Sequence, residues 1–218
     1  MGEDMKRRVA ILISGRGSNM AALIQAAAAE DFPAQIVVVV SNRSDAGGLE
    51  TAKASGVPTV TIESKPFGKD RSAFEAVLQS ALEQHQVDLI CLGGFMRLFT
   101  AEFVQRWYGR MLNIHPSLLP SFPGLDPQGQ ALRAGVKISG ATVHFVIPET
   151  DAGPILMQGA VAVRDDDTPD TLGTRILAIE HRIYPEALRL LAGGQIRLEG
   201  DICKTGSADS GDVLISPT

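Results

Sequence analysis

The sequence predicts an α/β fold, a mostly parallel twisted sheet with helices on both faces and antiparallel strands in its C-terminal part. Short apolar runs alternate with amphipathic segments through the first half of the chain, and this alternation is typical of Rossmann-like, parallel β-α-β architecture. Two later apolar runs are joined by a link too short for a crossover, which favours antiparallel pairing. Hydrophobic residues make up 44% of the chain, enough for a sizeable core.

The first half supplies five predicted strands, each an apolar run: Arg8–Ser14, Gln35–Asn42, Thr59–Glu63, Val87–Leu92 and Met111–His115. Helices are expected between them, from the Gly-rich turn to about Glu30, over Ala46–Ser55, from Arg71 onward and over Thr100–Tyr108. The third of these helices repeats apolar residues at helical spacing and should bury one face. The residues of that face are Phe74, Val77, Leu78, Ala81, Leu82 and His85.

The second half reads differently. Gly140–Ile147 and Pro154–Val163 are predicted strands that flank the polar turn Pro148–Gly153. Thr168–Leu191 is a long helix with Thr168 as its N-cap and Gly193-Gly194 as its end. Ile196–Leu198 is expected to form an edge strand. We expect residues 1–204 to form a single domain and residues 205–218, rich in Ser, Gly and Asp, to form a polar tail.

Composition restricts the function classes. The net charge of −5 argues against a nonspecific nucleic-acid binder. No apolar run approaches the roughly 18–20 residues that span a bilayer, and the apolar segment after the charged start is broken by Ser14-Gly15-Arg16-Gly17, unlike a signal peptide. Cys91 and Cys203 provide neither a disulfide framework nor a metal spacing. We therefore expect a cytoplasmic protein with small-molecule partners, no nucleic acid and no membrane.

The segment from Asn113 to Pro120 carries the strongest chemical signal. Asn113 and His115 stand two residues apart at the end of an apolar run, so a strand would project both side chains to one face. Pro116 then ends the strand. An amide can donate to a developing oxyanion and an imidazole can move a proton near neutral pH. The alternative is a strand-end histidine satisfied by the backbone, but the neighbouring amide and the two prolines favour chemistry.

Ser14 to Asn19 lies between the first strand and the first helix. Its glycines let the backbone approach a ligand, and the helix N-terminus presents free N–H groups, which predicts an anion site, most naturally for a phosphate. The segment matches neither the dinucleotide fingerprint nor the P-loop, so a small phosphorylated metabolite fits better than NAD or ATP. The alternative is a plain turn in which Ser18 and Asn19 cap the helix.

Other stretches are ambiguous from spacing alone. Gly93 to Leu98 follows a strand and is either the wall of a flat-ligand site or ordinary core. The Asp151-Ala-Gly-Pro turn is functional only if it lies near His115. Glu180 and His181 are expected on the solvated face of the long helix, and His85 and His144 are expected to be structural. No His, Cys and carboxylate set has metal-ligand spacing.

Together these stretches resemble the phosphoribosylglycinamide formyltransferase family, folate-dependent enzymes of purine biosynthesis. The resemblance runs from residue 8 to about 203. It is carried by Ser14–Asn19, Gly93–Leu98, Asn113–Pro120, Phe122–Leu125, Thr142–Val146, Asp151–Pro154 and Glu180–Pro185. It implies transfer of a formyl group from 10-formyltetrahydrofolate, as co-substrate, to the amine of 5'-phosphoribosylglycinamide, by a monomer or weak homodimer and with no metal.

The resemblance also implies roles for individual residues. A catalytic set would be formed by Asn113, His115 and Asp151. The ribonucleotide would be bound by Gly17, Ser18 and Asn19 at its phosphate and by Glu180 at its glycinamide end. The folate would contact Arg71, Met96, Arg97, Leu98, Phe99, Asn113, Ile147, Pro148, Glu149, Thr150 and Asp151. One departure stands out, because the family usually has a histidine where this chain has Gln128.

Three alternatives remain open. A formyltetrahydrofolate deformylase would release formate to water, but that family carries an N-terminal regulatory domain and only about seven residues precede the first strand here. Methionyl-tRNA formyltransferase shares the Ser-Leu-Leu-Pro loop but needs a tRNA-binding domain. A non-catalytic module that binds a phosphorylated metabolite would have no reason to keep Asn113, His115 and Asp151 together.

Overall fold

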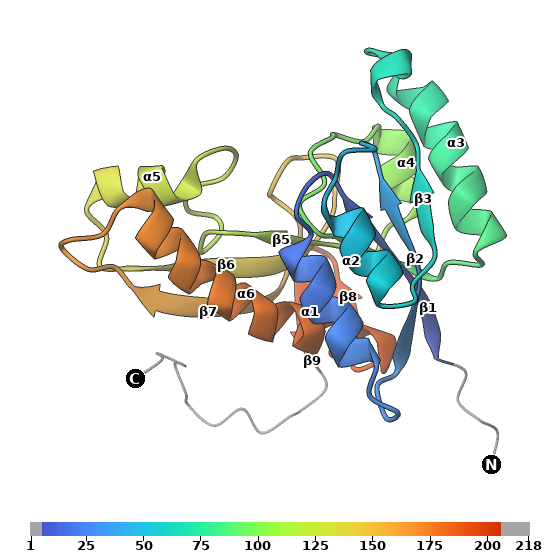
Figure 1. Cartoon of the computed structure of the whole chain (residues 1–218). Coiled ribbons are helices and arrows are strands. Elements are labelled where there is room, and N and C mark those ends of the chain that lie inside the picture. Colours follow the sequence, from blue (N-terminus) through green and yellow to red (C-terminus); the bar gives the residue numbers. More distant parts are fainter. Residues whose placement is uncertain (1–5, 206–218) are drawn as a thin grey trace. The chain divides into compact units, whose positions relative to one another are not determined.

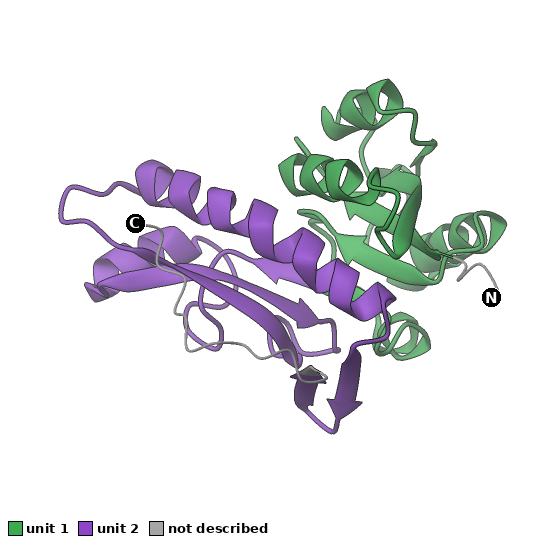
Figure 2. Ribbon diagram, turned by 90° about the horizontal axis from the view of Figure 1, so that it is seen from below, with its two compact units in different colours: residues 1–112 green, residues 113–218 purple. Residues whose placement is uncertain are grey.

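The structure is a computed structural model that describes residues 6–205. These residues fall into two compact units, divided between Leu112 and Asn113 (Figure 2). The predicted tail lies outside the described residues except for Thr205, which is the last residue of a strand. Over this range, no helix combines the length and the apolar composition that a bilayer crossing requires.

The first unit contains four parallel strands, β1 (Arg7–Ile13), β2 (Ala34–Ser41), β3 (Thr59–Thr61) and β4 (Leu89–Leu92). Their order is β3-β2-β1-β4, and every pair is parallel. The strand β5 (Met111–His115) begins in this unit, where the Ile90 N–H donates to the carbonyl of Arg110. The parallel arrangement predicted from the β-α alternation is confirmed.

Helices cover both faces of this sheet: α1 (Ser18–Ala27), α2 (Gly48–Ala54), α3 (Arg71–Gln84) and α4 (Ala101–Arg106), with the 3₁₀ turn η1 (Lys65–Phe67) before α3. Figure 1 shows α1 and α2 side by side. Because crossovers are right-handed and the chain reverses direction across the sheet after β3, α3 and α4 lie on the opposite face. Phe74, Leu78, Ala81 and Leu82 of the predicted stripe on α3 are buried, whereas Val77 is 46% exposed. His85, the C-cap of α3, is half-buried.

The second unit is built on the antiparallel pair β6 (Ile138–Phe145) and β7 (Ile155–Ala162), with β5 beside β6. The long helix α6 (Pro169–Ala192) packs on β6 and β7. Gly159 permits this close approach, since a Cβ there would lie 2.8 Å from Cγ2 of Ile179. Thr168 is the N-cap of α6, as predicted, and takes part in a capping box with Thr171.

Two features of this unit differ from the sequence-based expectation. Helix α5 (Pro127–Ala134) was not predicted because its polar start, Pro-Gln-Gly-Gln, hides the helical period; it begins at the Asp126 cap. The predicted edge strand near Ile196 is β8 (Ile196–Glu199), which pairs with β9 (Ile202–Thr205) in a separate antiparallel hairpin.

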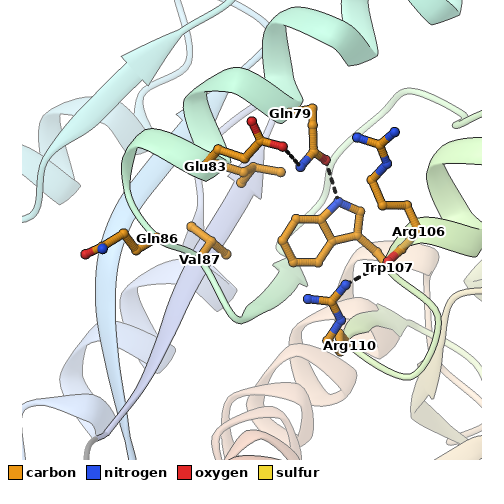
Figure 3. Close-up of a pocket in the computed structure, with 8 residues that line it drawn as sticks. Gln79, Glu83, Gln86, Val87, Arg106, Trp107 and Arg110 are labelled. Carbon is orange, nitrogen blue, oxygen red and sulfur yellow. Dashed lines mark hydrogen bonds between the residues drawn. The ribbon is translucent and has the colours of Figure 1, made fainter.

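A hollow of about 300 Å³ opens in the first unit near the amino ends of β4 and β5 (Figure 3). Its polar groups bond to one another: the Trp107 indole N–H donates to Gln79, whose amide donates to Glu83. The Arg110 guanidinium lies 4.6 Å from the centroid of the Trp107 ring and donates to the Arg106 carbonyl. These groups hold α3 and α4 together, which is a packing role.

Candidate functional site

The loop between β1 and α1 is built to expose backbone donors. Gly17 is the N-cap of α1 with a left-handed φ of 71°, and no side chain fills the cap position. The alternative in which Ser18 and Asn19 cap this helix is therefore wrong, because both are already in its first turn. An anion can occupy the space that a capping side chain would otherwise take.

The same loop is held from behind by the start of α2. The Gly48 N–H donates to the Gly15 carbonyl at 3.0 Å. A Cβ on Gly48 would lie 2.6 Å from Cδ1 of Ile13 and 3.2 Å from the carbonyl oxygen of Arg16, so only glycine allows α2 to come this close. The loop conformation therefore depends on a residue about thirty positions away, which spacing alone did not reveal.

A hydrogen-bond network joins the loops that follow the four parallel strands. Ser14 donates to Asn42 at 2.6 Å and accepts from the backbone N–H of Met96 at 2.8 Å. Asn42 donates in turn to Ser64 at 3.3 Å. The loop between β1 and α1 and the segment after β4 are thus fixed to each other through Ser14. Asn42 supports both loops, and no pattern in the sequence indicated this role.

The segment after β4 has no regular secondary structure. Met96 and Leu98 point outward and are 71% and 56% exposed, while the rings of Phe95 and Phe99 stack at 5.4 Å. The Arg97 guanidinium lies 4.6 Å from the centroid of Phe74 and donates to the Gly68 carbonyl. The segment therefore has an inner aromatic layer, formed by Phe95 and Phe99, and an exposed apolar edge, formed by Met96 and Leu98. That this edge contacts a ligand stays a prediction.

Glu75 holds the far end of this segment. Its buried carboxylate accepts from the backbone N–H of Thr100 at 2.6 Å and from the Thr100 hydroxyl at 2.5 Å. Thr100 is also the N-cap of α4 and accepts from Phe103 N–H. Arg71, by contrast, is exposed at the first position of α3.

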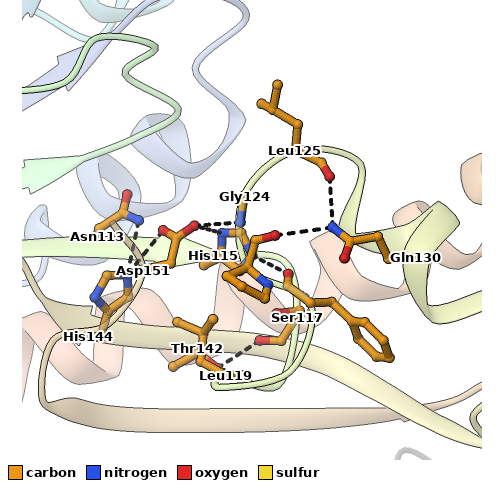
Figure 4. Close-up of polar contacts among 12 residues, drawn as sticks. Asn113, His115, Ser117, Leu119, Gly124, Leu125, Gln130, Thr142, His144 and Asp151 are labelled. Carbon is orange, nitrogen blue, oxygen red and sulfur yellow. Dashed lines mark hydrogen bonds and ion pairs between the residues drawn. The ribbon is translucent and has the colours of Figure 1, made fainter. Parts of the chain in front are cut away.

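In the second unit, β5 presents a buried histidine between two acceptors (Figure 4). Nδ1 of His115 lies 3.4 Å from Oδ2 of Asp151, and Nε2 lies 3.0 Å from the Phe122 carbonyl oxygen. A carbonyl can only accept, so Nε2 carries a proton and donates to it. The structure thus brings together His115 and Asp151, which are 36 residues apart in the sequence.

Asn113 is oriented by His144, which the sequence analysis took as merely structural. Nδ1 of His144 lies 3.0 Å from the Phe145 carbonyl and must donate to it. Its Nε2 therefore accepts from Nδ2 of Asn113 at 3.1 Å. Burial lowers the pKa of His144, against the opposing effects of Phe145 and Asp151, which keeps this ring neutral and able to accept. One amide proton of Asn113 is used here and the other remains available for an oxyanion.

The turn between β6 and β7 places Asp151. Asp151 has a left-handed φ of 53°, its side chain is 10% exposed, and its Oδ2 accepts from the Gly124 N–H at 2.8 Å. Gly153 fits against β6 so tightly that a Cβ would lie 1.8 Å from the Phe145 carbonyl oxygen. Of the other residues in the predicted folate loop, Ile147 is half-buried, whereas Pro148, Glu149 and Thr150 are exposed.

The loop after β5 is tied down by β6. The Thr142 hydroxyl donates to the Ser117 carbonyl at 2.7 Å and accepts from the Leu119 N–H at 3.0 Å. Gln158 donates to both the Leu119 carbonyl and the Thr142 hydroxyl. These contacts give the Ser-Leu-Leu-Pro stretch a structural role, since they fix where the chain turns after His115.

Two further residues correct the sequence-based picture. Glu180 is not on a solvated face but is buried on α6, on the same side as Ile176 and Ile183. Gln128 faces α6, because a Cβ on Gly173 would lie 3.9 Å from its side chain. The described residues hold no group of three or more His, Cys, Asp or Glu side chains arranged to bind a metal ion.

Comparison with known proteins identifies the family. A family model described as formyl transferase matches residues 7–188, most of the chain and parts of both units. The chain belongs to the formyl transferase family. Within this family, it is 40% identical to phosphoribosylglycinamide formyltransferase of Bacillus subtilis, over 86% of this chain and 95% of that protein.

Other members of the formyl transferase family extend the similarity. The bovine trifunctional purine biosynthetic protein adenosine-3 is 48% identical over 92% of this chain; the chain spans only 20% of the length of that relative. The crystal structure of glycinamide ribonucleotide transformylase 1 from Symbiobacterium toebii superposes with a TM-score of 0.89 at 46% identity, covering 94% of this chain and 95% of that one. A formyltetrahydrofolate deformylase from Pseudomonas syringae has a TM-score of 0.86 at 26% identity, covering 93% of this chain and 67% of that one.

Proposed function

We propose that this chain transfers a formyl group from 10-formyltetrahydrofolate to the amine of 5'-phosphoribosylglycinamide, a step of purine biosynthesis. The observation that carries the proposal is the buried His115 held 3.4 Å from Asp151. Asn113 lies on the same strand as His115, and its amide is oriented by His144 of the neighbouring strand β6. Family membership and the names of its relatives, which include phosphoribosylglycinamide formyltransferases, support the choice of reaction.

Each group has a chemical role in this proposal. The amine attacks the formyl carbon and forms a tetrahedral intermediate, whose oxyanion accepts the free amide proton of Asn113. The His115 imidazolium donates a proton to the leaving folate nitrogen, and Asp151 stabilises that charged form. The amine gives up one proton as the amide forms, and this proton restores the imidazolium at the end of the cycle. The proton available is the one that Nε2 gives to the Phe122 carbonyl, so this hydrogen bond is exchanged during turnover. Because side chains perform each step, no metal is required.

The remaining assignments are proposals of the same kind. The phosphate is assigned to Gly17, Ser18 and Asn19, and the glycinamide end to Glu180. The folate is assigned to Arg71, Met96–Phe99, Ile147–Thr150 and the neighbouring Asn113 and Asp151. We further propose a cytoplasmic monomer or weak dimer in which residues 1–204 act as one formyltransferase domain, consistent with a family match that includes parts of both units.

The competing function is hydrolysis of 10-formyltetrahydrofolate, which the resemblance to a deformylase keeps open. The two are separated by incubating the purified protein with 10-formyltetrahydrofolate with and without the ribonucleotide. Tetrahydrofolate release that depends on the amine, with formylated ribonucleotide as product, supports the transferase. Release of formate without the amine would identify a hydrolase.

Replacing Gly17 by Val is expected to raise the KM for the ribonucleotide with a smaller effect on kcat. The left-handed φ of 71° opposes a β-branched side chain, and even a Cβ would lie 3.1 Å from Cε of Met20. Steady-state kinetics in each substrate test this. Gly56→Val is the matched control, because Gly56 has a φ of 73° in open space away from the loop. An unchanged ribonucleotide KM in Gly17→Val would refute the phosphate assignment.

Replacing Glu75 by Gln is expected to raise the KM for the folate several-fold and leave the KM for the ribonucleotide near that of the parent. The amide can accept one of the two hydrogen bonds from Thr100 but loses the charge that strengthens both. Glu83→Gln, on the exposed side of α3, is the control. Equal rises in both KM values would mean that Glu75 stabilises the unit rather than the folate segment.

A further inference from the structure

The loop from Phe122 to Leu125 contacts both members of the His115–Asp151 pair through its backbone. The Phe122 carbonyl accepts from Nε2 of His115 at 3.0 Å, and the Gly124 N–H donates to Asp151 at 2.8 Å. The loop therefore sets the direction of the imidazole and of the carboxylate together. A shift of this short stretch would alter both groups at once.

The Phe122–Leu125 loop has few internal contacts that could fix its conformation. Leu125 is 80% exposed, and the φ values of Phe122 and Gly124 are positive, at 56° and 78°. Within the described part of the chain, no backbone–backbone hydrogen bond outside helices and strands involves residues 122–125. A non-glycine residue in the left-handed region persists only where the surroundings impose it.

The side chain of Gln130 holds the loop from the side of α5. Nε2 of Gln130 donates to the Pro123 carbonyl at 3.1 Å and to the Leu125 carbonyl at 2.9 Å, on either side of Gly124 (Figure 4). A primary amide nitrogen has two N–H groups, so it can serve both carbonyls simultaneously. A carboxylate of the same shape has only acceptors and would repel them.

Gln130 lies on α5, whose start is fixed by side-chain contacts. Asp126 caps α5 by accepting from the Gly129 N–H at 3.1 Å, and it also pairs with Arg133. Gly129 is required beneath this cap, since a Cβ would lie 2.3 Å from Oδ2 of Asp126. Ala131, which follows Gln130 in the helix, is fully buried. The helix therefore fixes the base of Gln130, and the amide transmits that position to the loop.

We propose that Gln130 is a positioning residue that sets the geometry of the His115–Asp151 pair by clamping the Phe122–Leu125 loop. Gln130 touches neither of the two reacting side chains, and it acts through the carbonyls of Pro123 and Leu125. Its kinetic consequences rest on the proposed function, whereas its effect on the His115 ring can be observed without turnover.

The test compares Gln130→Glu with Gln128→Glu. Both glutamines are half-buried on α5, but Gln128 faces Gly173 of α6 instead of the loop. At pH 8, Gln130→Glu should lower kcat about tenfold or more, as expected for a small misplacement of catalytic groups. The ribonucleotide KM should change little.

The control variant Gln128→Glu should keep the parent kcat. As the pH falls towards 5, the activity of Gln130→Glu relative to the parent should recover, because a protonated carboxyl regains one donor.

An independent readout is the ring ¹⁵N spectrum of histidine-labelled protein. In Gln130→Glu the Nε2 resonance of His115 should move, while that of His85 in the first unit should not. A parent-like kcat together with an unmoved His115 resonance would overturn the inference. A kcat loss that does not recover at low pH, with the resonance unmoved, would also overturn it and indicate a general loss of stability. If the parent lacks transferase activity but the resonance moves, the proposed function fails and the clamp stands.

Discussion

Asp151→Asn should lower turnover on the order of 10²-fold or more while ribonucleotide binding survives. The asparagine keeps the size of the side chain but removes the negative charge that lies 3.4 Å from Nδ1 of His115. Without that charge the imidazolium is less favoured, and its proton is what the leaving nitrogen needs. Single-turnover kinetics and ribonucleotide titration measure the two effects separately.

The matched control is Asp126→Asn. Asp126 has a φ of 55°, close to the 53° of Asp151, and an asparagine can adopt the same conformation and still cap α5. His115→Ala should be at least as damaging as Asp151→Asn. The double variant should lose much less than the product of the two losses, because the residues act as a unit. Losses that simply multiply would show that the two residues act independently.

The second large effect is expected at Asn113. Asn113→Ala should lower kcat roughly 10²- to 10³-fold, the usual cost of removing one oxyanion donor, and His144→Phe should produce part of the same loss. The phenylalanine keeps the volume of His144 but removes the acceptor for the Asn113 amide. An Asn113→Ala enzyme with parent-like kcat would exclude the amide from the oxyanion site.

His144 also predicts a dependence on pH. Its pKa is held below the usual value of 6.5 by burial, with Asp151 opposing and His115 adding to the shift. The unfolded chain therefore binds this proton more readily than the folded one, and stability should fall as the pH drops below about 6.5.

When the folded His144 ring is protonated, its Nε2 becomes a donor and no longer accepts from Asn113. Urea unfolding and kcat between pH 8.5 and 5.5 should both depend less on pH in His144→Gln; identical acid limbs in parent and variant would contradict this.

The sequence was most reliable where the signal was local. The parallel strands of the first unit, the antiparallel pair β6 and β7 and the cap of α6 all follow from residues adjacent in the chain. The spacing of Asn113 and His115 likewise follows from the period of a strand. Helix α5 was missed because its polar first turn has no apolar period, although Asp126-Pro127 is a recognisable start.

Errors arose where a residue's role depended on a distant neighbour. The helical pattern predicted a solvated face for Glu180, to which only the family resemblance gave a role, and His144 was expected to be structural. The packing of α6 decided that Glu180 is buried, and the placing of β6 beside β5 decided that His144 meets Asn113. The sequence predicted no role for Gln130, since an amide on a short helix has many possible partners.

By itself, therefore, the sequence determined the order of the strands and helices apart from α5 and β9, the glycine-rich loop before α1, and the placing of Asn113 and His115 on one strand. These features depend on backbone periodicity, glycine conformation and caps, which operate over a few residues. Only the tertiary structure decided that Asp151 reaches His115, that His144 accepts from Asn113, and that Gln130 spans the loop between them. The first two contacts join residues more than thirty positions apart and the third joins residues seven positions apart, so each depends on distances that only folding sets.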